Sequence, residues 1–360
     1  MAIMSEAIVS AYISRKLALV LPIVFIFEGC IEPFDGKSTD YENSLVVDAA
    51  IFDTPGPYQV LLSRSRPFGT ANSLPQTGAS VCVTTLEGAC YPFKEVAPGK
   101  YLSDSAEWRG QPGTTYKLEI DVNGIHFESS EELLRSTPAI DSVYYELEER
   151  YTDAEEVLSG IALFVDTHDE NNSTRFYKWT SIESWEIKIE YPIHFNLWKC
   201  YDSDTSKIIQ IATTRGLSKN VVSRHELNYV STEGFRLGSY YSLLVRQSAI
   251  DQKAYKYWSE IKQSNEMAGS LFDIQHYPIR GNIHNTSDAG EVVLGYFEVL
   301  SIQDKRIFIS RRDVKDLNFP LPSCYSVWDG PPPDPRFLPR RCTDCTYHGG
   351  SLNKPDFWPN

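Results

Sequence analysis

The sequence predicts a mainly β protein with two folded domains, one helix and an irregular Pro-rich tail. From Ser44 onward, short runs of alternating apolar and polar residues are separated by turns rich in Gly, Pro and Asn, which is the pattern of half-buried strands. Aromatic residues make up 12% of the chain and 21 of them are Tyr, a composition that suits β-sheets with aromatic faces. Without the first 29 of its 360 residues the chain is still long enough for two domains.

Residues 1–29 have the form of a lipoprotein signal peptide. Arg15 and Lys16 precede an apolar run over residues 17–27, which is shorter than the roughly 20 residues of a bilayer span. The run ends at a Gly-Cys pair, as a bacterial lipobox does. Cleavage before Cys30 and lipidation of its thiol are therefore expected, and several acyl chains together hold a protein stably on a membrane.

The next residues, 30–43, form an acidic tether with four carboxylates and one cation, Lys37. The tether resembles the one that sends some lipoproteins of the Bacteroidota to the cell surface, and a plain solvated linker is the alternative. Phe27 and Glu28 stand where a lipobox usually has small or aliphatic residues. An uncleaved signal anchor or an ordinary secretory signal therefore stays open beside the expected lipid anchor in the outer membrane.

The charge balance excludes some partners. The chain has 48 acidic and 34 basic residues, which gives a net charge of −14. Nucleic acid and an anionic bilayer surface would repel such a protein, so neither is expected as its main partner.

Residues 44–138 are expected to form an immunoglobulin-like β-sandwich. About seven short strands follow one another with no convincing helix, as in such domains. Asn123-Gly124 between two alternating runs is a strong hairpin signal, and Leu86-Glu87-Gly88 marks another hairpin turn.

Residues 139–319 are expected to form a larger β-sandwich or open barrel that carries one helix over residues 248–266. Ser248 with Asp251 forms a capping-box start, and an apolar face recurs at helical spacing through Ala254 and Trp258. That face is expected to pack on the sheet.

Residues 320–360 form a Pro- and Cys-rich tail, because Pro interrupts both ladders and helices. The tail is either an ordered strap or a disordered end. Its aromatic residues, Phe337, Tyr347, Phe357 and Trp358, favour a strap that docks, since disordered segments contain few of them.

Six cysteines remain after Cys30, and outside the cytosol disulfides are the default expectation. Cys82 and Cys90 flank the predicted hairpin turn, so a bridge across it is plausible. A bulged turn would keep the two from lying directly opposite, and small apolar packing is the alternative. In the tail, Cys324, Cys342 and Cys345 are candidates for disulfide stapling.

Two metal sites are weaker alternatives. Cys324, Cys342, Cys345 and His348 could supply four zinc ligands within the tail. Asp166, Asp169 and Glu170 could hold calcium through oxygen ligands, although they lack an EF-hand spacing and an acidic turn explains them equally. A thioredoxin-type redox role for the Cys-x-x-Cys motif is disfavoured because no helix is expected there.

No local motif of hydrolases, zinc proteases or nucleotide-binding enzymes is present, which weighs against an enzyme. No cofactor is expected beyond the covalent lipid on Cys30.

Segments along the whole chain from Cys30 resemble the domain-of-unknown-function family 4249, a family of Bacteroidota lipoproteins. The similar segments are residues 30–34, 56–64, 78–81, 95–101, 269–273, 279–283, 294–297, 342–345 and 354–359. Members of that family are typically encoded beside TonB-dependent outer-membrane transporters. The resemblance implies an accessory lipoprotein of such a transporter and carries no catalytic residues.

The expected function is therefore that of a non-enzymatic surface lipoprotein that captures ligand for a β-barrel TonB-dependent transporter or gates its channel. The ligand is not identified by the sequence. A surface hydrolase of an envelope or nutrient polymer and a structural or adhesive envelope protein are the alternatives.

Overall fold

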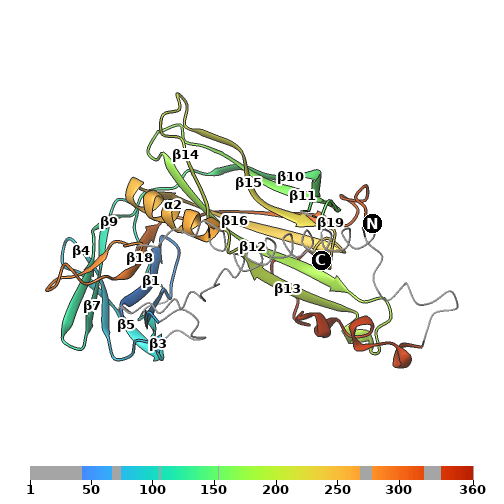
Figure 1. Cartoon of the computed structure of the whole chain (residues 1–360), viewed down its shortest axis with the longest axis horizontal. Helices are drawn as coiled ribbons and strands as arrows, with labels where there is room; N and C mark the ends of the chain where they lie inside the picture. The colour runs from blue at the N-terminus through green and yellow to red at the C-terminus, as the bar shows by residue number, and fades with distance from the viewer. Residues whose placement is uncertain are drawn as a thin grey trace, which may run out of the picture. The chain divides into compact units, whose positions relative to one another are not determined.

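The computed structural model describes residues 43–66, 74–104, 107–152, 154–267, 278–319 and 334–359, all within the compact unit Glu42–Asn360 (Figure 1). The expected mainly β class is confirmed. The leader, the tether, Cys30 and Cys324 lie outside the described residues. The first part of the fold is an eleven-stranded sheet. Its strands are β1 (Leu45–Phe52), β2 (Gln59–Arg64), β3 (Leu74–Pro75), β4 (Ser80–Thr85), β5 (Cys90–Ala97), β6 (Lys100–Ser103), β7 (Thr115–Val122), β8 (Ile125–Ser129), β9 (Glu132–Leu133), β17 (Ile283–Asn285) and β18 (Leu294–Leu300).

Alternation in the sequence explains the strands of this sheet. In β1, Leu45, Val47, Ala49 and Ile51 are buried while the residues between them are more accessible. This is the period of two that places successive side chains on opposite faces. The hairpin between β7 and β8 turns at Asn123-Gly124, where both residues have positive φ values of 54° and 78°, as a type I′ turn requires.

Two strands from late in the chain complete this first sheet. β18 pairs in parallel with β1, and β17 pairs antiparallel with β8 at the other end of the strand order. Figure 1 shows β1 and β18 side by side. Arg280 bridges Leu294, so the two ends of the sheet meet and it nearly closes on itself.

This closure changes the expected domain plan. The immunoglobulin-like detail predicted for residues 44–138 is not confirmed, because their strands share one sheet with residues 283–300. Those later residues were expected to belong to the second domain. Their alternation identifies strands, but not the sheet that each strand joins.

The second part is a sandwich of two antiparallel sheets that share one core. The three-stranded sheet contains β10 (Ile140–Tyr151), β11 (Val157–His168) and β15 (Val221–Ser231). The five-stranded sheet contains β12 (Phe176–Lys188), β13 (Lys199–Thr205), β14 (Gln210–Thr213), β16 (Tyr240–Ile250) and β19 (Gln303–Ser310). Leu163 from one sheet and Trp179 and Leu243 from the other are among the buried residues between them.

Helix α2 (Gln252–Met267) packs where β18 approaches β12 and β14. The expected helix is present, but its start differs from the prediction. Ser248 is buried in β16 opposite Lys178, and the side chain of Asp251 accepts from the backbone N–H of Ala254 at 2.8 Å. Asp251 therefore caps the helix without Ser248, because β16 continues to Ile250.

The described part of the tail, residues 334–359, docks as a strap. Three short 3₁₀ turns, η3 (Pro335–Phe337), η4 (Arg340–Cys342) and η5 (Cys345–His348), lead to a two-way backbone bridge between Ser351 and Tyr201 at 2.7 and 2.8 Å. Trp358 is buried against the rings of Tyr201 and Phe308. The end of the chain thus covers part of the five-stranded sheet. A further 3₁₀ turn, η2 (Phe195–Leu197), lies between β12 and β13.

Candidate functional site

A groove of about 460 Å³, lined by both polar and apolar side chains, lies between α2 and the segment that leads into β17 and β18. Its lining comes from three regions far apart in the sequence: the end of β8, the first half of α2, and residues 280–296. The lining residues are Ser130, Lys253, Lys256, Tyr257, Glu260, Arg280, Gly281, Asn282, Ile283, His284, Ala289, Glu291, Val293 and Tyr296. The volume falls within the range of sites that hold small molecules.

Two glycines allow the wall of this groove to form. A Cβ on Gly281 would lie 1.5 Å from the carbonyl oxygen of Gly295, and one on Gly295 would lie 1.8 Å from that of Val47. Gly295 also has a φ of +98°, which L side chains rarely adopt. The backbones of residues 280–283 and of β18 can therefore approach closely, with β18 seated on β1.

Asn282 links residues 280–283 to β18 through hydrogen bonds. Its side-chain amide accepts from the backbone N–H of Phe297 at 2.8 Å and donates to the Phe297 carbonyl at 3.0 Å. The amide thus takes the place of a neighbouring strand. It also donates to the buried Glu132 at 2.8 Å, and Ser130 donates to the same carboxyl oxygen at 2.9 Å.

Glu132 is a buried carboxyl beneath the groove. It is 7% exposed, and the hydroxyl of Tyr296 donates to it at 3.4 Å. Burial raises the pKa of the Glu132 carboxyl despite these hydrogen bonds, because the charged form loses its hydration. Glu132 therefore supports Asn282 and Tyr296, both of which line the groove.

Aromatic side chains of α2 contact β18 and the buried ion pair of Lys178 and Glu298. The rings of Tyr257 and Tyr296 lie 5.0 Å apart and join the helix to β18. On the helix, Trp258 donates its indole N–H to Glu298 at 2.8 Å, and the ammonium of Lys178 lies 3.7 Å from the Trp258 ring centroid. This packing fixes the position of α2, and hence of the groove side chains on it.

Charged groups of both signs line the groove. Lys253, Lys256 and Arg280 are the cations, and Glu260 and Glu291 are the carboxylates. The ammonium of Lys256 lies 3.7 Å from Glu260. Glu291 accepts from the side-chain amide of Asn285.

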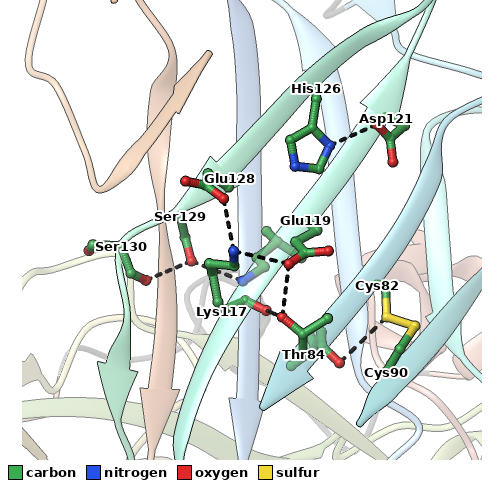
Figure 2. Close-up of polar contacts among 12 residues, drawn as sticks. Cys82, Thr84, Cys90, Lys117, Glu119, Asp121, His126, Glu128, Ser129 and Ser130 are labelled. Carbon is green, nitrogen blue, oxygen red and sulfur yellow. Dashed lines mark hydrogen bonds and ion pairs between the residues drawn. A yellow bond between two sulfur atoms is a disulfide. The ribbon is translucent and has the colours of Figure 1, made fainter. Parts of the chain in front are cut away.

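A charged face of the first sheet adjoins the groove at His284, which lies 3.5 Å from Glu128. Figure 2 shows Lys117 between Glu119 and Glu128, at 3.1 and 2.8 Å. The Lys117 ammonium lowers the pKa of the Glu128 carboxyl through this hydrogen bond. Within this face the opposite charges pair with each other, which distinguishes it from the groove.

Among the predicted site residues, the expectation of disulfides is confirmed. Cys82 and Cys90 are joined, with Cα atoms 6.0 Å apart (Figure 2). Cys82 lies opposite Pro92 in the sheet, so the bridge runs diagonally across the hairpin.

A second disulfide joins Cys345 of the tail to Cys200 of β13, and Cys342 is disulfide-bonded too. The sequence reasoning did not assign Cys200 to any pair. It stands alone within a strand, 145 residues before its partner, and no spacing rule links the two.

These disulfides correct the zinc hypothesis. Cys342 and Cys345 are oxidised and have no thiolate to offer a metal, and His348 is hydrogen-bonded to the carbonyl of Arg341 at 2.7 Å. Cys324, the fourth proposed ligand, lies outside the described residues.

The structure does not bring the three proposed calcium ligands together. Asp169 directs its carboxylate to the backbone N–H groups of residues 171, 173 and 174, whereas Asp166 lies in β11 and accepts from Ser142 and Arg224. The side chain of Glu170 is 86% exposed. Across the described ranges, no three His, Cys, Asp or Glu side chains are grouped so that they could hold a metal ion.

Glu183 and Glu186 are two other buried carboxylates, and the sequence reasoning did not single them out. The odd-numbered and even-numbered positions of β12 face opposite sides of its sheet, so these two side chains do not converge. Glu183 pairs with Arg236 at 3.0 Å, and Glu186 pairs with Lys188 at 2.9 Å. Both are explained as ion pairs of the sandwich.

Taken together, the fold and the groove define a mainly β protein, stapled by disulfides, with a groove between helix α2 and a nearly closed sheet. The chain belongs to the family described as domain of unknown function DUF4249, whose model matches residues 31–306. A comparison with curated proteins finds no match. In the part of the chain that the structure describes, no helix has the length and apolar character that a membrane span needs.

Two of the segments that carry the family resemblance meet at the groove. Residues 279–283 and 294–297 are bridged by Arg280 and Leu294 and supply Asn282 and Tyr296 to the lining. A third segment, residues 95–101, has a structural role instead, because Glu95 accepts from the backbone N–H groups of Gly78 and Gly99.

Proposed function

We propose that this protein is a lipid-anchored, non-enzymatic accessory of an outer-membrane transporter and that it captures a small ligand in the groove between α2 and residues 280–296. The observation that carries the proposal is the groove itself. It has the volume of a small-molecule site and a lining of polar and aromatic groups that are held in place by Asn282 and Tyr296.

The location and partner in this proposal rest on the sequence. The apolar run that ends at Cys30 and the acidic tether after it support a lipid anchor and exposure at the cell surface. The family resemblance supports a TonB-dependent β-barrel transporter as the partner. Ligand capture is favoured over channel gating because a groove of this size suits a small molecule.

The groove favours binding over the alternative of polymer hydrolysis. Its two carboxylates already have partners, with Glu260 beside Lys256 and Glu291 beside Asn285. A general acid must carry a proton to donate, whereas Glu260 lies beside a cation and Glu291 accepts a hydrogen bond.

The proposal is tested by extracting the native protein from its membrane with a mild detergent and identifying what purifies with it. We expect a β-barrel transporter in the purified complex and a mature N-terminus at Cys30 that carries the mass of lipid. The Cys30→Ser variant serves as the control and should leave the membrane fraction. Recovery of the unmodified protein only as a free monomer would count decisively against the proposal.

A further inference from the structure

We propose that the groove binds an anionic, hydroxyl-bearing small molecule about the size of one or two sugar rings. This inference rests on the proposed capture function and names the chemical class of the ligand. The groove volume of about 460 Å³ is too small for a folded partner and is ample for such a molecule.

Lys253 and Arg280 would bind the acidic group of the ligand. Both side chains are exposed on the groove, and neither has a carboxylate partner among the residues that the structure describes. Within the described ranges, the Arg280 guanidinium donates one long hydrogen bond, of 3.4 Å, to the carbonyl of Gly290. A guanidinium with free donors suits a carboxylate or a phosphate, since it can offer two parallel N–H groups.

The local charge contrasts with that of the whole chain. Three cations and two carboxylates line the groove, whereas the chain has a net charge of −14. A cationic site within an acidic protein gives an anion a favourable place to bind on a molecule whose net charge repels it. The charged face around Lys117 is not expected to bind the anionic ligand, because the Lys117 ammonium is already paired with two carboxylates.

Hydrogen-bond acceptors in the same lining would bind the hydroxyl groups of the ligand. Glu260, Glu291 and Ser130 offer oxygen atoms that accept from hydroxyls. The two carboxylates also disfavour a highly charged polyanion, which limits the ligand to one or two negative charges. Ile283, Val293 and Tyr296 supply an apolar floor for the carbon skeleton.

Three sugars that share the glucose ring and differ at C6 test this assignment by calorimetric titration into the full-length protein in mild detergent. Glucuronate carries a carboxylate, glucose 6-phosphate carries a phosphate, and glucose carries no charge. We expect at least one of the anionic sugars to bind about tenfold or more tightly than glucose, since a charged hydrogen bond contributes more than a neutral one. The tighter of the two anions then identifies the acidic group that the site prefers.

Variants locate the binding within the protein. Lys253→Gln and Arg280→Gln should each weaken binding of the preferred anion by about tenfold. Lys207→Gln, which makes the same charge change on the connection between β13 and β14, should leave binding unchanged. Equal binding of glucose and both anions, no binding of any of the three, or equal affinity in all three variants would overturn the assignment.

The titration and the co-purification fail independently. Anion binding without a transporter would retain the ligand class and remove the proposed partner. A transporter complex without anion binding would retain the accessory role and remove this ligand.

Discussion

The ammonium of Lys178 lies 2.7 Å from both carboxylate oxygens of Glu298 and joins β12 of the sandwich to β18 of the first sheet. Both side chains are 12% exposed, and Trp258 of α2 covers the pair with a hydrogen bond and a cation–π contact. Three elements that are remote in the sequence are therefore held together at one buried point. The orientation of α2, and of the groove beside it, depends on this contact.

Replacing Lys178 with Met should lower the free energy of unfolding by about 3 to 5 kcal/mol, because the Glu298 carboxylate would remain buried without its cation. The double variant with Glu298→Leu as well should recover most of that loss. Urea denaturation of the parent, the two single variants and the double variant measures both effects. If the two single replacements and the double replacement were additive, the pair would not be coupled as described.

Gly281→Ala should destabilise the protein by about 2 to 3 kcal/mol, since its Cβ would overlap the carbonyl of Gly295 and force the two backbones apart. Gly290→Ala is the matched control, because the nearest atom to its Cβ is 3.1 Å away on the flexible side chain of Asp288. Thermal unfolding compares the two variants. Equal stabilities would show that the close approach of residues 280–283 to β18 is not required.

His225 makes stability depend on pH. Its ring stacks on Trp179 with centroids 4.6 Å apart, and burial lowers its pKa to about 4, with a smaller contribution from Lys262. An unfolded His has a pKa of about 6.5. Between pH 6.5 and 4 the unfolded chain therefore binds a proton that the folded protein excludes, and stability falls as the pH decreases.

Between pH 7 and pH 4.5, His225 should account for about 2 to 3 kcal/mol of lost unfolding free energy. The His225→Gln variant should lose that much less than the parent protein over the same interval. Denaturation at the two pH values gives the difference. An identical loss in the two proteins would mean that His225 is not neutral in the folded state.

The disulfides should differ in their contribution to stability. Cys200–Cys345 spans 145 residues and fixes the tail strap to β13, whereas Cys82–Cys90 spans eight. Because a longer closed loop restricts the unfolded chain more, replacing Cys200 and Cys345 with Ser should cost about 4 to 5 kcal/mol, and replacing the hairpin pair about 2 to 3. Chemical denaturation ranks the variants, and the reverse order would contradict this account.

Local signals in the sequence predicted local structure. The alternation in β1, the Asn123-Gly124 turn and the apolar face of α2 all depend on neighbours within a few residues, and all are present. Of the tail aromatics that favoured a docked strap, Trp358 is buried, because burial removes its apolar ring from water, whereas Phe337 and Tyr347 are exposed.

Long-range partners could not be predicted in the same way. The parallel pairing of β1 with β18 and the bond between Cys200 and Cys345 join positions more than 140 residues apart. The sequence around one member of each pair does not indicate which distant segment is its partner. The groove was missed for the same reason, since Lys253 and Arg280 come from separate elements. The one available signal was that residues 279–283 and 294–297 both carried the family resemblance, although the sequence did not show that they meet.

The most direct test of ligand capture at the groove is amide hydrogen exchange on the full-length protein in mild detergent, with and without the preferred anionic hexose. The account predicts slower exchange that is confined to the first half of α2 and to residues 280–296, and that is lost in the Arg280→Gln variant. Unchanged exchange in those two segments, or protection that appears only elsewhere in the chain, would contradict it.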